Sequence, residues 1–334
     1  MAYGTINADV IGTSVANSNL GAGNASIMKN RIINGAMYVA QRATSATLTA
    51  GGTIANGYAT VDRFYGYCTG ANVTMAQVSG TGNNRNLLQF TGAASVTAIG
   101  CGQRIESLNS YDLAGSTVTL SAYIANSLLT SVTWTAYYAT TTDTFGTLAS
   151  PTRTQIATGT FTVTSTLTQY NAQITVPSAA TTGIEIVFTV GAQISGTFQL
   201  GLVQLEVGSS ATGFEYRQYG QELALCQRYY VQVTGAVSSI VGSGQGQLTT
   251  LFNTPFRYPV QMRSAPSLVT TGTAGDYSVL QGNTSSVSTS IPSINSATNQ
   301  SCYIDFTSGA TLTAGYSGWS SILANKYLGF NSEL

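Results

Sequence analysis

The feature that most constrains this chain is an alternation of apolar and polar residues with a period of two. In residues 118–124 (VTLSAYI) the apolar side chains share one face, and residues 132–138 and 184–190 repeat the pattern. Successive side chains of a β-strand point to opposite faces, so each segment is predicted to be a strand with one buried side. Trp134, whose alternation partners are apolar, is predicted to lie in a core.

In residues 198–207 (FQLGLVQLEV) the apolar phase changes within one segment. It runs first through Phe198, Leu200 and Leu202, and then through Val203 and Leu205. One extra residue inserted into a strand shifts the phase in this way, so a β-bulge is predicted near Leu202.

Clusters of Gly, Asn, Ser and Thr separate the alternating segments, and the chain is rich in β-branched residues. Both properties favour an all-β fold. We predict an extended N-terminal arm (1–30), a first β-sandwich (31–218), a short helical joint (219–230) and a second β-sandwich (231–334). The arm has Asp9 and Lys29 as its charged residues and too few apolar residues for a core, so it is expected to order against another protein.

Charge and histidine content exclude several function classes. The chain has no net charge, no Lys/Arg cluster and no histidine, and charged residues make up 7% of it. Without basic patches, neither nucleic acid nor an anionic membrane is an expected partner. Without histidine, Ser-His-Asp triads and His-ligated zinc are excluded, and no catalytic residue, metal or cofactor is predicted. A protein near zero net charge tends to associate, which favours an oligomer.

Targeting signals and cysteine pairs are also missing from the sequence. The N-terminus lacks the basic and apolar regions of a secretory signal, and no apolar run reaches membrane-spanning length. Four cysteines lie far apart and form no CxxC pair, so free, mostly buried thiols are favoured over disulfides. They are Cys68, Cys101, Cys226 and Cys302.

Residues 214–230 (FEYRQYGQELALCQRYY) concentrate charge in a weakly charged chain, which raises the alternative of an active site. Apolar residues at helical spacing from Gln221 onward instead predict a short amphipathic helix. Because strands are predicted on both sides, we interpret the stretch as a structural joint, with Leu223 and Tyr230 buried and Glu222 and Arg228 at the surface. The residues assigned to this joint are Glu215, Arg217, Glu222, Leu223, Arg228 and Tyr230.

A second charged site lies near the start of the first sandwich. Asp62 and Arg63 follow the strand-like segment YATV, and Gln41 and Arg42 end another apolar run. A hydrolytic dyad requires a second carboxylate nearby, which the sequence does not supply. We therefore interpret this site as a structural ion pair.

Several segments resemble a module that recurs in bacteriophage virion proteins. They are RIINGAMYVAQR from residue 31, YATVDRFYGY at 58–67, LGLVQLEVGSSATGFEYRQYGQELALCQRYY from residue 200, FRYPVQMRSAPSL at 256–268, and the final KYLGFNSEL. This module is typical of tail-fibre or appendage subunits, often from cyanophages. The resemblance implies a jelly-roll-like sandwich similar to carbohydrate-binding modules, a homotrimer, and a location in the virion.

Trp319 and Tyr316 are the candidate ligand-binding residues. They occur in AGYSGWSS, which reads as a Gly/Ser loop without apolar periodicity. Glycan sites use an exposed aromatic ring for the apolar face of a sugar, and amide, hydroxyl or carboxylate groups for its hydroxyls. The alternative is that these aromatic residues anchor a subunit interface.

Three functions follow from these observations. The first is a tail fibre or appendage subunit that attaches to the particle by its arm and binds a glycan on the host surface. The second is a capsid decoration, cement or tail-connecting protein whose partners are other virion proteins. The third, an enzyme that cleaves polysaccharide, is disfavoured because the twelve acidic residues form no paired carboxylate motif.

Overall fold

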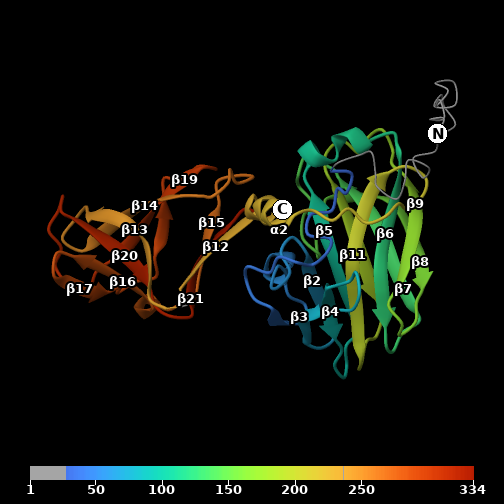
Figure 1. Ribbon diagram of the computed structural model, residues 1–334, viewed down its shortest axis with the longest axis horizontal. Helices are drawn as coiled ribbons and strands as arrows, with labels where there is room; N and C mark the ends of the chain where they lie inside the picture. The colour runs from blue at the N-terminus through green and yellow to red at the C-terminus, as the bar shows by residue number, and fades with distance from the viewer. Residues whose placement is uncertain (1–27, 236) are drawn as a thin grey trace, which may run out of the picture. The chain divides into compact units, whose positions relative to one another are not determined.

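The computed structural model describes residues 28–235 and 237–334, and its regular structure is almost entirely antiparallel β-sheet (Figure 1). The all-β prediction is confirmed. The chain forms two compact units, the first extending through Arg217 and including Leu334, and the second covering Gln218–Glu333. Residues 1–27 of the predicted arm lie outside the described residues.

Two antiparallel sheets form the first unit, and each pairs strands that are distant in sequence. The six-stranded sheet has the order Ser45–Leu48 (β1), Val73–Ser79 (β3), Asn86–Thr91 (β4), Thr197–Val207 (β11), Thr117–Asn126 (β6) and Thr168–Thr175 (β9). The five-stranded sheet has the order Tyr65–Thr69 (β2), Ala98–Ile105 (β5), Ile184–Val190 (β10), Ser131–Ala139 (β7) and Arg153–Thr162 (β8).

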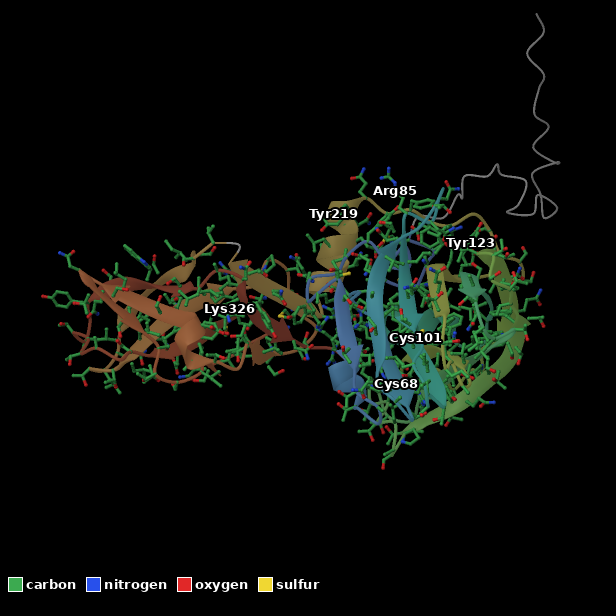
Figure 2. All side chains as sticks on the ribbon, turned by 90° about the horizontal axis from the view of Figure 1, so that it is seen from below. Cys68, Arg85, Cys101, Tyr123, Tyr219 and Lys326 are labelled. Carbon is green, nitrogen blue, oxygen red and sulfur yellow. The ribbon has the colours of Figure 1, made fainter. Side chains whose placement is uncertain are left out.

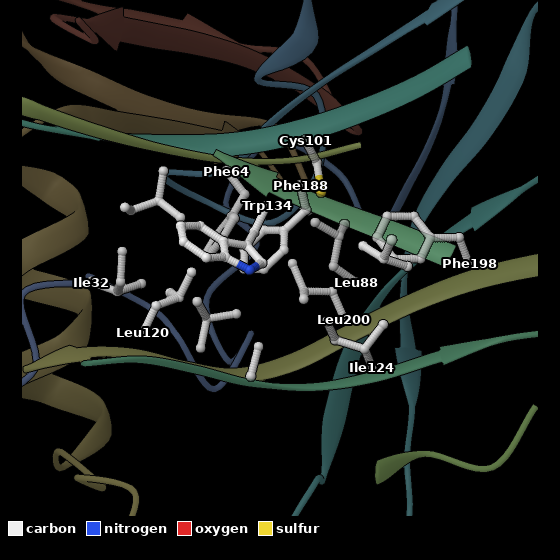
Figure 3. Packing of buried hydrophobic residues seen from close by; sticks show 14 of the residues in the cluster. Ile32, Phe64, Leu88, Cys101, Leu120, Ile124, Trp134, Phe188, Phe198 and Leu200 are labelled. Carbon is white, nitrogen blue, oxygen red and sulfur yellow. The ribbon is translucent and has the colours of Figure 1, made fainter. Parts of the chain in front are cut away.

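The core of the first unit lies between these two sheets. Figure 3 shows Trp134 and Phe188 of the five-stranded sheet lying over Leu120 and Leu200 of the six-stranded sheet, and all four are buried. The predicted core position of Trp134 is therefore confirmed. Burying each of these large apolar side chains is worth about 1.5–3 kcal/mol, which fixes the strand faces against one another.

The predicted strands and bulge are present. Residues 118–124, 132–138 and 184–190 lie within β6, β7 and β10. The pairing of β11 with β6 shifts register between Gly201 and Gln204, where Leu202 has a φ of 42°. This irregularity is the bulge that the phase change predicted.

In the second unit a three-stranded and a seven-stranded sheet form the architecture. The three-stranded sheet has the order Tyr230–Gly235 (β12), Lys326–Asn331 (β21) and Ser267–Thr270 (β15). The seven-stranded sheet has the order Thr284–Val287 (β17), Tyr277–Gln281 (β16), Ser317–Ile322 (β20), Ser239–Gly246 (β13), Leu251–Arg257 (β14), Ser301–Thr307 (β19) and Ser293–Asn295 (β18).

A separate aromatic core joins these two sheets. Phe256 of β14 stacks on Phe330 of β21 with ring centroids 4.7 Å apart. Phe252, Ile304 and Phe306 are buried in the same cluster. They occupy one face of β14 and β19, so the opposite face of the seven-stranded sheet points away from this core.

Helices are few and short in both units. The α-helices are Ile54–Gly57 (α1) and Tyr219–Gln227 (α2), and 3-10 turns occupy Ser107–Asn109, Tyr111–Leu113 and Ala274–Asp276. The helix α2 lies in the predicted joint. It ends at Gln227, so Tyr230 is the first residue of β12 and does not continue the helical stripe.

All four cysteines are buried and free, as predicted. Cys68 and Cys101 lie on the adjacent strands β2 and β5 of the first unit (Figure 2). Burial raises the pKa of the Cys101 thiol, so this cysteine remains protonated and packs as a small apolar side chain.

Candidate functional site

Trp319 lies on strand β20, not in a loop as the sequence analysis proposed. It pairs with Ser243 of β13 on one side and with Leu280 of β16 on the other. Its side chain is 44% exposed, whereas its neighbour in the opposite phase, Ser320, is fully buried. Trp319 therefore projects from the outer face of the seven-stranded sheet.

A second aromatic residue lies on the same face in the same cross-strand row. Tyr303 of β19 is 45% exposed and pairs with Pro255 of β14. Gln245 pairs with Asn253, and continuing this register by two residues places Ser243 near Pro255. Ser243, Pro255 and Tyr303 also line one groove, which connects the two aromatic residues across the sheet. We call this set the aromatic row: Leu280, Trp319, Ser243, Pro255, Tyr303 and Asn295.

A row of polar residues runs alongside, two residues further along each strand. Ser317 pairs with Gln245, Gln245 with Asn253, and Asn253 with Asp305. We call this set the polar row: Ser317, Gln245, Asn253, Asp305 and Ser293.

Hydrogen bonds hold the carboxylate of the polar row in place. The Asn253 amide donates to Asp305 Oδ1 at 2.6 Å, and the Asn295 amide donates to Asp305 Oδ2 at 3.3 Å. Asp305 stays half-buried and retains further lone pairs, since each carboxylate oxygen accepts more than one hydrogen bond. This carboxylate is therefore a positioned acceptor at the sheet surface.

A surface groove of about 430 Å³ lies over residues of β13, β14, β19 and β20, and Tyr303 is one of its lining residues. It is lined by residues of both rows, among them Ser243, Gln245, Asn253, Pro255, Tyr303 and Ser317. Trp319 and Tyr303 are three strands apart, which corresponds to roughly 14 Å at a strand spacing of about 4.8 Å. Tyr303 thus lines the groove directly, and Trp319 lies beside it as the strand partner of the lining residue Ser243.

Tyr316 occupies a different position from Trp319. It precedes β20, its side chain is exposed, and its carbonyl oxygen accepts the Gly246 amide at 3.0 Å. Gly246 lies in the phase opposite to that of Ser243 and Gln245. Tyr316 is therefore not part of the aromatic row, and Tyr303 is the second aromatic residue that the structure brings to Trp319.

The outer face of the seven-stranded sheet offers few charged groups to a ligand. Among the described residues on its strands, Asp305 is the one carboxylate, and glycoside hydrolysis normally requires two carboxylates on either side of the bond. The described residues also contain no group of three or more His, Cys, Asp or Glu that could hold a metal ion. Rings, amides, hydroxyls and one fixed carboxylate remain as the groups available to a ligand.

Glu215 and Arg217, assigned to the joint, fasten the start of the described chain to the first unit. Glu215 accepts the backbone amides of Met28 at 2.5 Å and Asn30 at 2.8 Å. Arg217 pairs with Glu215 at 3.4 Å and donates to the Ile32 carbonyl at 3.2 Å. These contacts lie within the first unit, whereas the sequence analysis assigned both residues to the joint between the two sandwiches.

The burial predicted for the helix was partly wrong. Glu222, expected at the surface, is 5% exposed, and Leu223, expected to be buried, is half-exposed. Tyr230 is buried as predicted, and its hydroxyl donates to Gln232 at 2.6 Å. Arg228 is half-buried, and its carbonyl oxygen accepts the Arg263 amide at 2.7 Å. The apolar stripe of α2 is too weak for periodicity to identify its buried face.

Asp62 forms an ion pair with Arg42, 3.8 Å away. Asp62 also accepts the Gln41 backbone amide at 3.0 Å. Burial raises the pKa of Asp62, although Arg42 and the Gln41 hydrogen bonds oppose the shift. Arg63 donates to the Arg104 carbonyl at 2.5 Å. An ion pair is therefore present at this site, with Arg42 as a partner of Asp62.

Sequence reasoning missed a charged cluster on the outer face of the five-stranded sheet. Glu185 of β10 is fully buried and accepts the Tyr65 hydroxyl at 2.7 Å and the Arg104 guanidinium at 2.8 Å. Arg153 of β8 pairs with its second oxygen and lies 4.0 Å above the Tyr137 ring. Burial lowers the pKa of Arg153, but Glu185, together with Tyr65 and Tyr137, raises it overall.

A tyrosine packs against the floor of the same face. A Cβ atom added at Gly100 of β5 would lie 2.1 Å from Cζ of Tyr67, so this ring lies directly on the glycine backbone. Burial raises the pKa of Tyr67 to about 12. The signal for this close approach, a glycine inside a buried strand, is present in the sequence but does not name its partner.

Comparisons with known proteins were made for the whole chain. No protein-family model and no curated protein sequence matches it.

Among the described residues, no helix is long and apolar enough to cross a membrane.

Three solved structures are similar to part of this chain. The enzymatically active domain of tailspike protein 4 from bacteriophage CBA120 is 16% identical, over 54% of this chain and 22% of that chain, with a TM-score of 0.35. A CBM4 structure is 14% identical over 53% of this chain and 99% of that chain, with a TM-score of 0.34. The CBM22-2 xylan-binding domain from Paenibacillus barcinonensis is 18% identical over 43% of this chain and 91% of that chain, with a TM-score of 0.31.

The role of the Glu185 cluster can be tested by replacing its carboxylate. Glu185→Gln leaves two guanidiniums without their counter-charge, so we expect the first unit to lose about 3–5 kcal/mol of unfolding free energy. Asp112→Asn is the matched control, because its pair with Arg31 is exposed and worth about 0–1 kcal/mol. Urea denaturation of both variants gives the comparison, and equal small effects would show that the cluster is not a structural element.

Proposed function

We propose that this chain is a structural subunit of a bacteriophage virion, a tail fibre or other appendage, whose second unit binds a glycan on the host surface. The virion assignment is supported by the segments that resemble the recurring phage module. The glycan assignment is carried by one observation, the row in which Trp319 and Tyr303 project from the same sheet face beside fixed polar groups.

A glycan fits this arrangement better than a second protein does. A sugar ring has an apolar face of C–H groups, which packs on an aromatic ring, and an edge of hydroxyls that bind amides and carboxylates. Here the rings are separated by Ser243 and Pro255 and bordered by the polar row. The fully buried core of a protein interface is instead depleted in charged residues. The aromatic and polar rows therefore favour a hydroxyl-rich ligand.

Binding without cleavage is part of the proposal. A single carboxylate on the face supplies a hydrogen-bond acceptor but not the acid and nucleophile, or acid and base, of a glycosidase. Asp305 is that carboxylate, and amide donors occupy part of its hydrogen-bonding capacity. The chain would then attach a particle to a surface polysaccharide and leave the polysaccharide intact.

Removing the indole tests the glycan assignment. Trp319→Ala should weaken binding of the purified chain to the host surface polysaccharide about tenfold or more, because an aromatic platform beneath a stacked ring is worth about 1–3 kcal/mol in nucleic-acid complexes. Tyr111→Ala removes a more exposed aromatic ring from the first unit and should change nothing. Unchanged affinity in the Trp319 variant, with unfolding temperatures equal to wild type, would refute the assignment.

Attachment and assembly complete the proposal. We propose that residues 1–30 anchor the chain to the particle and that three copies associate, with their arms leaving at one end. A chain lacking residues 1–27 should keep the sedimentation mass of a trimer and fail to join particles. Normal incorporation of the shortened chain into particles would count against the arm as the anchor. A sedimentation mass near 34.7 kDa for the intact chain would count against the trimer.

A further inference from the structure

The length of the aromatic row restricts which glycans can use it fully. Trp319 and Tyr303 belong to β20 and β19, which are separated by β13 and β14. Three strand spacings place the two rings roughly 14 Å apart. A single sugar ring cannot touch both, whereas an oligosaccharide of several units can.

The direction of the ligand follows from the same register. Both rings lie in one cross-strand row, so a ligand that contacts both must run across the strands and not along them. Between the rings the row carries Ser243 and Pro255, which are small enough to leave the groove open. The ligand backbone therefore has a continuous path over β13 and β14.

Hydrogen-bonding groups lie along one side of this path. Gln245 is exposed, and no described residue hydrogen-bonds to its side chain, so its amide can both donate and accept. Asp305 is fixed by Asn253 and Asn295 and offers its remaining lone pairs. Hydrogen bonds to an ionised carboxylate are about twice as strong as those between neutral groups, so Asp305 favours an edge of hydroxyl donors.

We infer that the ligand is an oligosaccharide segment longer than a disaccharide, which lies across β20, β13, β14 and β19. It stacks on Trp319 and on Tyr303 at its two ends, and its hydroxyl groups face Gln245 and Asp305. Tyr303 is thereby a specificity-determining residue that selects for chain length. This inference rests on the proposed glycan binding and adds the length and direction of the ligand.

A length series tests the inference. The polysaccharide bound by the intact protein is partially hydrolysed with acid, and its fragments are separated from monosaccharide to hexasaccharide. For the wild-type chain, calorimetric affinity should rise about tenfold or more at the length that first spans both rings, because two stacked contacts replace one. In Trp319→Ala and in Tyr303→Ala this step should disappear, so that long fragments bind no better than short ones.

Matched variants separate the loss of a ring from a loss of folding. Trp319→Phe and Tyr303→Phe keep a ring at each position and should keep the step. Val287→Ala removes an exposed apolar side chain from the same sheet, outside both rows, and should also keep it. Unfolding temperatures of all variants identify any that are misfolded. If an alanine variant is misfolded, the phenylalanine variants show whether an aromatic ring at that position is enough to keep the affinity step.

The outcomes distinguish this inference from the proposed function. An affinity that does not depend on length, or a step that survives in Tyr303→Ala, overturns the inference and leaves glycan binding in place. Absence of binding to polysaccharide at every length overturns both. A step that is lost in both alanine variants and retained in both phenylalanine variants supports the spanning ligand.

Discussion

A β-sheet has two faces, and the sandwich packing of this chain covers one face of each sheet with a core. In the first unit, the outer face of the five-stranded sheet is filled by the chain itself, through Glu185, its arginines and the ring of Tyr67. In the second unit, Phe252, Ile304 and Phe306 cover the inner face of the seven-stranded sheet, and its outer face carries Trp319 and Tyr303. Large exposed apolar patches are typical of binding sites, and this face is a candidate because it carries two exposed aromatic side chains beside a groove. The side chains of the candidate site therefore lie on the outer face because the core of the second unit covers the inner face of the same sheet.

The strand register connects the core to the site. A slip of one residue in β20 or β19 would move every side chain of that strand to the opposite face. Such a slip would bury Trp319 or Tyr303 and expose Ile322 or Ile304, at a cost of about 1.5–3 kcal/mol for each large apolar side chain transferred. The stack of Phe256 on Phe330 fixes β14 against β21, and β14 is one of the two strands that lie between the two aromatic residues. Buried residues that touch no ligand thus set the spacing of the site.

Much of the fold could be predicted from local pattern, and much of the site could not. Strands such as 118–124 and the bulge at Leu202 have strong apolar phases, and these survive in the structure. The sequence predicts a loop at Trp319 because Gly318 and Ser320, whose positions face the core, are not large apolar residues. The strand therefore shows no apolar alternation. In residues 301–307 (SCYIDFT) the apolar residues Cys302, Ile304 and Phe306 alternate with polar ones. This pattern does predict that Tyr303 and Asp305 lie on the outer face of the sheet. No pattern in the sequence could show that Arg104 and Arg153 would meet Glu185, because long-range pairing brings them together.

The central claim is that Trp319 lies on a free sheet face that a glycan covers. The chain has two tryptophans, and Trp134 is buried in the first core while Trp319 is exposed. Acrylamide quenching of tryptophan fluorescence in the intact protein separates them directly. The account predicts that one tryptophan is quenched in the free protein and becomes protected when the host surface polysaccharide is added to saturation. Protection of both tryptophans before any polysaccharide is added would show that another copy of the chain covers this face, and quenching that persists at saturation would show that the glycan binds elsewhere.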